Sequence, residues 1–320
     1  MKVNVKEILM AICLGFVVPG LILGTSVKRK VLPSPQTELP PATQTEAPQR
    51  TSVPIELELS DGSIQTMDLE DYLVGVVLGE MPASFETEAL KAQAVVARTY
   101  TLKCAEAGVK HGVGRMCGDY ACCQAYVDRE AYTGTQEDYD KIRNAVESTW
   151  GQVITYQGKL IEATYFSCSG GITEDAVAVW GTDYPYLRSV ESPGEEHATY
   201  YTDEVFFTAG EFQDKLGQKL SGSPANWLGF TTYTAGGGVN TIRIGDKDYK
   251  GTDLRMLLGL RSTAFSMEAE EDGIRVITKG FGHRVGMSQY GADAMALQGK
   301  NYEEILTHYY QGTELSDYEN

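Results

Sequence analysis

Glu80 is the first residue whose type and position suggest chemistry. It lies at the end of an apolar segment, residues 69–81, that predicts a helix capped by Asp68 and ended by Pro82, because proline disfavours helical geometry in the residue before it. The helix dipole and the apolar neighbours both disfavour a carboxylate at this point, so both raise the pKa of the Glu80 carboxyl group. From the sequence alone, Glu80 is either a solvated surface residue or a carboxylic acid kept protonated to act as a general acid.

Two basic residues follow on the next predicted helix, an alanine-rich segment from Ser84 to about Gly108. Lys91 and Arg98 are seven residues apart, so they share a helix face at 3.6 residues per turn. Beside Glu80 they would bind a polar substrate or hold the carboxyl group ionised. The alternative is an exposed basic stripe with ordinary helix ion pairs, and periodicity does not choose between these readings.

A possible metal site lies in the irregular stretch 109–136, which contains one histidine and three cysteines: His111, Cys117, Cys122 and Cys123. Zinc binds such a set tetrahedrally in structural sites, and four protein ligands leave no open position for catalysis. A disulfide, for instance Cys117 with Cys123, is the competing reading outside the cytoplasm. We interpret the scattered later histidines as polar surface or core residues rather than ligands: His197, His283 and His308.

The elements that must position these residues alternate between helices and strands. A hairpin is predicted around Asp61-Gly62, and a second around Gln157-Gly158 within residues 152–167. Further helices are predicted at 137–150, near 211–220, from about Met287 and from Tyr302, with strands near 241–250 and 274–279. This order predicts an α+β fold with mixed helices and mostly antiparallel strands: one large domain, residues 55–320, with a loop-rich insertion near 181–240.

The start of the chain differs in composition from the rest. With 42% hydrophobic residues the chain is not wholly disordered, and a net charge of −17 argues against nucleic-acid binding. Residues 1–30 are basic, and Ile8–Gly24 is uncharged and mostly apolar, which predicts an uncleaved single-pass membrane anchor, with a removed signal peptide as the alternative. Residues 31–54 are rich in Pro and Thr and predict a linker. Because basic residues that flank a membrane span tend to stay on its cytoplasmic side, Lys2 and Lys6 predict that the chain after the anchor lies outside the cytoplasm.

Several long motifs resemble one known family. YLVGVVLGEMPASFETEALKAQAVVARTY is similar to the signature of the stage II sporulation protein D (SpoIID) family, and the match continues through YFSCSGG, WGTDYPYL and GFGHRVGMSQYGA. The resemblance implies a membrane-anchored lytic transglycosylase, a carbon–oxygen lyase of endospore formers. Such an enzyme cleaves the peptidoglycan strands between N-acetylmuramic acid and N-acetylglucosamine, after removal of the stem peptides, to 1,6-anhydro products during forespore engulfment. It would work in the mother-cell membrane facing the forespore, beside stage II sporulation proteins P and M.

The resemblance also implies roles for individual residues. Glu80 matches the catalytic glutamate, and Lys91 and Arg98 match basic residues that serve the active site. Polar residues of two motifs are suited to binding sugar hydroxyl and acetamido groups: Tyr165, Ser167, Ser169, Ser288, Gln289 and Tyr290. Some clostridial members look as though they carry a metal site, which favours zinc over a disulfide in the loop. Arg284 departs from the pattern, which has glycine after the histidine. The alternative function is a non-catalytic scaffold that binds peptidoglycan. A third possibility, a zinc hydrolase, is disfavoured because the sequence has neither an HExxH motif nor an open set of three ligands.

Overall fold

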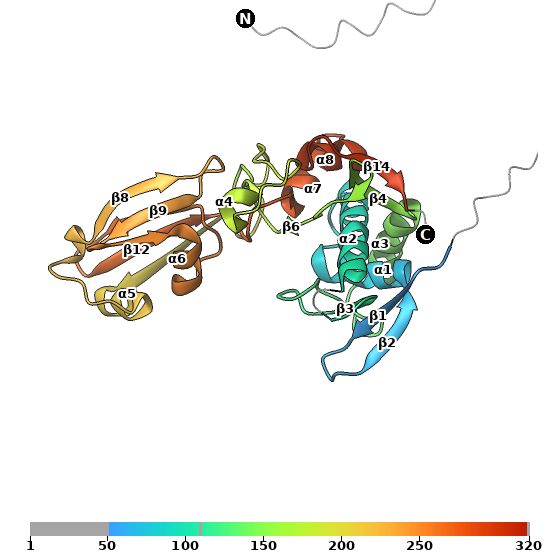
Figure 1. Cartoon of the computed structure of the whole chain (residues 1–320), viewed down its shortest axis with the longest axis horizontal. Helices are drawn as coiled ribbons and strands as arrows, with labels where there is room; N and C mark the ends of the chain where they lie inside the picture. The colour runs from blue at the N-terminus through green and yellow to red at the C-terminus, as the bar shows by residue number, and fades with distance from the viewer. Residues whose placement is uncertain (1–50, 109–110, 319–320) are drawn as a thin grey trace, which may run out of the picture. The chain divides into compact units, whose positions relative to one another are not determined.

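The computed structural model describes residues 51–108 and 111–318 (Figure 1). The predicted anchor Ile8–Gly24 and most of the predicted linker lie outside these residues. In the part that is described, every helix is too short or too polar to cross a membrane. The described chain has two hydrophobic cores, which we use to define a helical lobe, residues 51–190 and 281–318, and a sheet lobe, residues 202–279.

The helical lobe is built around two buried helices. The helix α1 (Leu69–Glu80) begins at Asp68, whose side chain accepts a hydrogen bond from the Glu70 amide, and it ends before Pro82, as the sequence predicts. The helix α2 (Thr87–Ala107) packs against α1, α3 (Gln136–Ser148), α7 (Gln289–Leu297) and α8 (Tyr302–Tyr309). Its alanines allow this close packing on several sides at once, and Gly108 ends it in the left-handed conformation.

Short strands surround these helices. The predicted hairpin joins β1 (Pro54–Glu58) to β2 (Ile64–Asp68), and β3 (Arg115–Cys117) lies parallel to β1. The second predicted hairpin joins β4 (Gln152–Tyr156) to β5 (Lys159–Leu160), and β14 (Glu314–Asp317) pairs with β4. The short strands β6 (Tyr165–Phe166) and β13 (Met287–Ser288) form a parallel pair, and the short helix α4 (Ala176–Trp180) follows β6.

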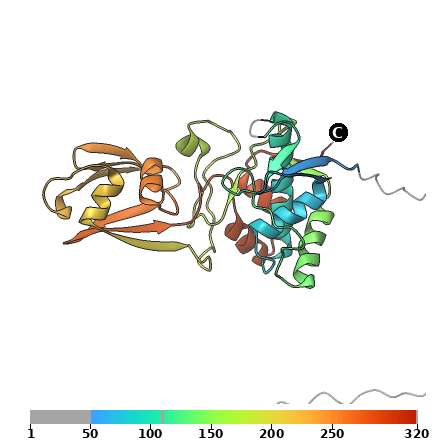
Figure 2. The ribbon, with the colours of Figure 1, turned by 90° about the horizontal axis from the view of Figure 1, so that it is seen from below.

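The sheet lobe has its own strands and helices (Figures 1 and 2). One sheet has the order β11 (Phe265–Ala269), β12 (Gly273–Lys279) and β7 (Thr202–Thr208); the other has the order β10 (Lys247–Lys250), β9 (Val239–Ile244) and β8 (Leu228–Tyr233). The helices α5 (Ala209–Leu216) and α6 (Gly251–Leu258) pack on these strands, and η1 (Pro224–Asn226) precedes β8.

The α+β class with mostly antiparallel strands is confirmed. The predicted loop-rich insertion at 181–240 differs from the structure, because this stretch contains β7, α5 and β8. These elements pack with later ones, up to β12, on one core. The local sequence does not reveal that core, since β7 pairs with a strand about 70 residues further along the chain.

Arg284 links the two lobes at the position where the family pattern has glycine. Its backbone is in the left-handed region, with φ 67°, a conformation that favours the glycine expected at this position and that the arginine adopts here. The buried guanidinium donates to the carbonyl groups of Ser169 and Gly236, at 2.8 and 2.7 Å, and pairs with Glu174. These bonds join Ser169 of the helical lobe to Gly236 of the sheet lobe.

Candidate functional site

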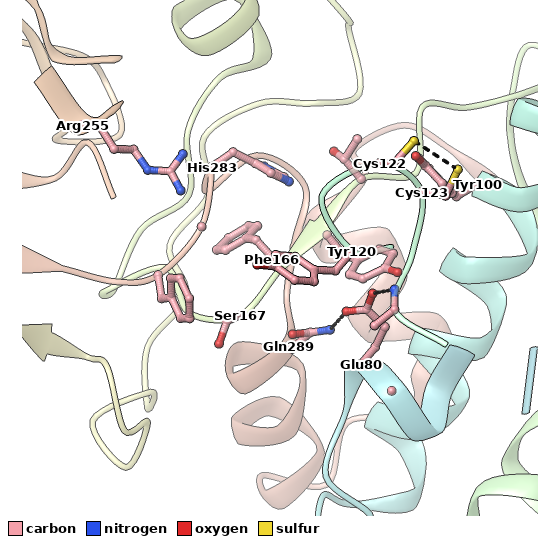
Figure 3. Close-up of a pocket in the computed structure, with 16 residues that line it drawn as sticks. Glu80, Tyr100, Tyr120, Cys122, Cys123, Phe166, Ser167, Arg255, His283 and Gln289 are labelled. Carbon is pink, nitrogen blue, oxygen red and sulfur yellow. Dashed lines mark hydrogen bonds between the residues drawn. The ribbon is translucent and has the colours of Figure 1, made fainter. Parts of the chain in front are cut away.

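A pocket of about 600 Å³ lies where residues of the two lobes meet (Figure 3). The end of α1 contributes Glu80, the segment from β6 contributes Tyr165 and Ser167, and the start of α7 contributes Gln289. The pairing of β6 with β13 brings these last two segments together, although they are about 120 residues apart in the sequence. The remaining lining residues come from the same ends of α1 and β6, from Tyr100 on α2, from the loop before α3, from residues 281–283 and, in one case, from α6.

The Glu80 carboxyl group is held from two sides. Its Oε1 accepts a hydrogen bond of 2.7 Å from the Ala125 amide, and its Oε2 lies 3.4 Å from the donating Nε2 of Gln289 (Figure 3). Burial raises the pKa of this carboxyl group, and the hydrogen bonds from Ala125 and Gln289, together with the nearby Tyr165 hydroxyl group, oppose that shift only in part. Glu80 is therefore a half-buried carboxylic acid in a pocket and not a freely solvated surface residue.

A glycine on α1 allows the loop to approach Glu80. A Cβ atom added to Gly79 would lie 3.0 Å from the backbone of Ala125, closer than ordinary van der Waals contact. Glycine inside a helix lowers helix stability, so the close approach of the loop explains its presence here. The same contact brings the Ala125 amide within reach of the carboxyl group.

Tyr165 extends the network behind Glu80. Its hydroxyl group donates to Oε1 of Gln124 at 3.1 Å, and Nε2 of Gln124 donates to the Thr101 hydroxyl at 2.8 Å. Thr101 in turn donates to the Ala97 carbonyl group within α2. Because burial raises the pKa of Tyr165 well above its ordinary value, its phenol stays protonated and remains a donor.

The other predicted polar residues have structural surroundings. Ser169 is buried and donates to Glu195 at 2.9 Å, while buried Ser288 caps α7 by accepting from the Gly291 amide. Tyr290 packs edge-on against Phe85 and lies outside the pocket lining. Of the six predicted sugar-binding residues, the structure thus places three in the pocket: Tyr165, Ser167 and Gln289.

The two predicted basic residues of α2 do not meet the pocket. Arg98 is fully buried and forms an ion pair of 2.5 Å with Glu70, with a further hydrogen bond to the Gln152 carbonyl group. This burial contradicts the prediction that Arg98 binds substrate, because its guanidinium is enclosed by the core. Lys91 pairs with Glu88 at 2.7 Å and lies over the ring of Tyr302, outside the pocket lining.

The four predicted metal ligands come together in the loop beside Glu80. The ligand atoms of His111, Cys117, Cys122 and Cys123 all lie within 4.8 Å of one another. The amides of the two adjacent cysteines both donate to the Asp119 carbonyl group, which forms the kink that turns them to one side. In the structure Cys117 and Cys123 are not joined by the disulfide that was the alternative reading.

These residues fit zinc. Three sulfur atoms and one imidazole nitrogen are a zinc set, and a modest contraction would bring them to bond lengths of about 2.0–2.3 Å. His111 Nδ1 lies 3.3 Å from a carboxylate oxygen of Glu58, leaving Nε2 next to the Cys122 sulfur, also at 3.3 Å. A carboxylate that holds the second ring nitrogen is the usual support of a zinc-bound histidine. The pairing of β1 with β3, which sets Glu58 beside Cys117, builds this support.

The pocket residues to which sequence reasoning gave no role include His283 and Arg255. His283 was interpreted as a surface or core histidine, yet it lines the pocket; its Nδ1 accepts from the Val285 amide at 3.1 Å. Burial, with a contribution from nearby Arg255, lowers its pKa to about 4, so this histidine is neutral at pH 7. Its place in GFGHRVGMSQYGA was a usable signal. Arg255, on α6, stands in no motif that points to the pocket.

Glu80, a carboxyl group with a raised pKa that accepts hydrogen bonds from amide donors in a pocket, is suited to acid–base chemistry. The SpoIID family model, described as stage II sporulation protein, matches residues 60–156. Stage II sporulation protein D of Bacillus subtilis is 42% identical over 273 residues, which cover 83% of this chain and 79% of the relative. The Bacillus amyloliquefaciens protein of the same name has the same identity and coverage. The chain therefore belongs to the SpoIID family.

A more distant relative contains a segment similar to most of this chain within a longer protein. The amidase enhancer of Bacillus subtilis is 30% identical over 300 residues, covering 77% of this chain but 40% of the relative.

Proposed function

We propose that the protein is a peptidoglycan lytic transglycosylase in which Glu80 is the general acid and base. The observation that carries this proposal is a Glu80 carboxyl group that is held in a pocket by Ala125 and Gln289 and whose pKa burial raises. A protonated carboxyl group at neutral pH is the form that donates to a glycosidic oxygen.

The pocket composition favours a mechanism with one carboxyl group. Ordinary glycosidases use two carboxyl groups, either about 5–5.5 Å apart or about 6.5–9.5 Å apart. Among the described residues that line the pocket, Glu80 is the only carboxyl group. In a lytic transglycosylase the 6-hydroxyl group of the muramyl sugar replaces the second carboxylate as the nucleophile, and its position in the same sugar gives it a high effective concentration.

The proposed reaction returns the proton in one cycle. Glu80 donates its proton to the bridging oxygen as the bond from that oxygen to the muramyl anomeric carbon breaks. The 6-hydroxyl oxygen bonds to the anomeric carbon, and its proton passes to the Glu80 carboxylate. The hydrogen bonds from Ala125 and Gln289 stabilise that carboxylate between the two transfers.

Aromatic side chains near the pocket suit a sugar substrate. Trp180 is 43% exposed, and its ring lies 5.2 Å from that of His283, centre to centre. The ring of Phe166, which lines the pocket, lies 5.6 Å from that of the same histidine. Such rings offer large apolar faces against which a saccharide ring packs.

We further propose that the loop holds a structural zinc ion through His111, Cys117, Cys122 and Cys123. A bound zinc supplies folding free energy to a segment with little regular structure. Cys123 is followed directly by Gln124 and Ala125, the residues that contact Tyr165 and Glu80, so ordering this loop also orders the site.

Family membership supports the proposed cellular role. We propose that the protein acts on denuded strands in forespore engulfment, anchored through Ile8–Gly24 in the mother-cell membrane and in company with stage II sporulation proteins P and M. None of the residues described by the structure identifies a surface for these partners.

Product chemistry tests the proposal. Denuded glycan strands are digested with the wild type, Glu80→Gln and the control Glu130→Gln, and the products are identified by mass spectrometry. Glu130 is an exposed carboxyl group outside the pocket, so its variant serves as the control. We expect 1,6-anhydro products from the wild type and Glu130→Gln, and none from Glu80→Gln. Glycan binding by the wild type without any anhydro product would instead support a non-catalytic scaffold.

A further inference from the structure

Arg255 is the one arginine or lysine among the described residues that line the pocket, and the proposed acid–base chemistry does not use it. It extends from α6 of the sheet lobe, is half-buried, and points its guanidinium toward the pocket beside His283 (Figure 3). Among the described arginines it is the one whose side chain forms no ion pair, hydrogen bond or ring contact. The others all have such partners: Arg98, Arg115, Arg129, Arg143, Arg188, Arg243, Arg261, Arg275 and Arg284.

The absence of a partner for Arg255 is notable in so acidic a protein. The chain has a net charge of −17, so carboxylates for internal ion pairs are abundant. Within the described lining of the pocket, the only carboxyl group is Glu80, which accepts hydrogen bonds from Ala125 and Gln289 and whose pKa burial raises. His283 next to Arg255 is neutral. A partly desolvated cation without an anion is unfavourable, and burial lowers the pKa of this guanidinium.

We propose that Arg255 binds a carboxylate of the substrate. The choice of ligand rests on the proposed function: a muramyl residue without its stem peptide exposes a lactyl carboxylate, whereas a peptide-bearing residue has a neutral amide there. The planar guanidinium donates two parallel hydrogen bonds to a carboxylate, and an amide cannot accept both. Arg255 thus selects glycan strands whose peptides have been removed.

This assignment gives the sheet lobe a role in recognition. Arg255 and Glu80 lie at different ends of the pocket, with His283 and Phe166 between them (Figure 3). A saccharide that reaches both residues contacts both lobes. The helical lobe then supplies the acid–base group and the sheet lobe supplies the specificity for the carboxylate.

Binding measurements in a variant that does not cleave test this inference. The ligands are a glycan oligosaccharide with free lactyl carboxylates and the same oligosaccharide with these groups methyl-esterified. We expect Glu80→Gln to bind the free acid about tenfold or more tightly than the ester. Glu80→Gln/Arg255→Gln should bind both ligands equally. Glu80→Gln/Arg255→Lys should retain part of the preference, because lysine keeps the positive charge but not the two parallel N–H donors of the guanidinium.

The control is Glu80→Gln/Arg243→Gln, which removes an exposed arginine of the same lobe that pairs with Asp248 outside the pocket. It should keep the full preference for the free acid. A preference that survives Arg255→Gln, or no preference in Glu80→Gln, would overturn the inference. The product assay above separates this result from the proposed function: a wild type that yields anhydro products while Arg255→Gln leaves the acid-to-ester ratio unchanged refutes the role of Arg255 alone.

Discussion

The two lobes contribute to the pocket in different ways. The helical lobe presents Glu80 within an internal network, in which hydrogen bonds from Ala125 and Gln289 hold the carboxyl group in place. The sheet lobe presents Arg255, which has no partner among the described residues. A group that must exchange a proton is positioned by the protein, whereas a group that recognises a ligand keeps its donors available.

Arg98 and Arg255 show the same contrast for one residue type. Arg98 satisfies its donors with Glu70 and with carbonyl groups of the core, and is fully buried. Arg98 therefore stabilises the folded helical lobe and does not contact a ligand in the pocket. Arg255 is half-buried without such partners, so its removal should affect ligand binding and leave folding intact.

The largest expected effect follows from this pair. Arg98→Gln should lower the free energy of unfolding by about 3–5 kcal/mol, because it leaves the Glu70 carboxylate buried without its partner. Arg255→Gln should change it by no more than about 0.5 kcal/mol, as for substitutions outside the core. Chemical denaturation followed by circular dichroism measures both. Equal destabilisation by the two variants would show that Arg255 is a structural residue and would remove the contrast.

Local signals made part of the site predictable. Asp68, the apolar run and Pro82 fixed the ends of α1, and hence the place of Glu80. The ligand types and short spacing of His111 and the three cysteines sufficed to predict their cluster. In each case the information lies within a few residues of the chain, which is why no knowledge of the tertiary structure was needed.

Other parts of the site depend on long-range packing. Periodicity showed that Lys91 and Arg98 share a helix face, but not that helices and strands cover that face at Arg98. Arg255 reaches the pocket only because the sheet lobe folds around its own core, through pairings such as β7 with β12. Neither fact is encoded in a local pattern, since burial and lobe formation depend on segments distant in the sequence.

The next largest effect concerns the contact between α1 and the loop. In Gly79→Ala, the added Cβ would displace the Ala125 backbone, which it would otherwise approach to 3.0 Å. A displaced Ala125 amide no longer holds the Glu80 carboxyl group, so kcat/KM should fall by about tenfold to a hundredfold. Stability should change by no more than about 1 kcal/mol, because alanine favours the helix and offsets part of the strain.

Gly210→Ala is the matched control for that variant. Gly210 lies in α5 of the sheet lobe, and an added Cβ there meets no atom within 4 Å. Activity should be unchanged, and stability equal or slightly higher. Wild-type kcat/KM in Gly79→Ala, measured by release of anhydro products, would show that the loop contact does not position Glu80.

The smallest effect is a shift in pH dependence at Gln289. Glu80 must be protonated to act as the acid, so kcat/KM should fall as the pH rises through its raised pKa. The hydrogen bond from Gln289 stabilises the carboxylate and lowers that pKa. Gln289→Ala should therefore raise the pKa of Glu80 further and move the basic limb of the profile of kcat/KM against pH to higher pH. The maximal rate should decrease, because the Glu80 carboxylate formed during the reaction loses a hydrogen-bond donor. Gln298→Ala, at the exposed far end of α7, should leave the limb in place. A basic limb that stays fixed or moves to lower pH in Gln289→Ala would mean that another group controls it, and the internal network of the helical lobe would then have no part in tuning the acid.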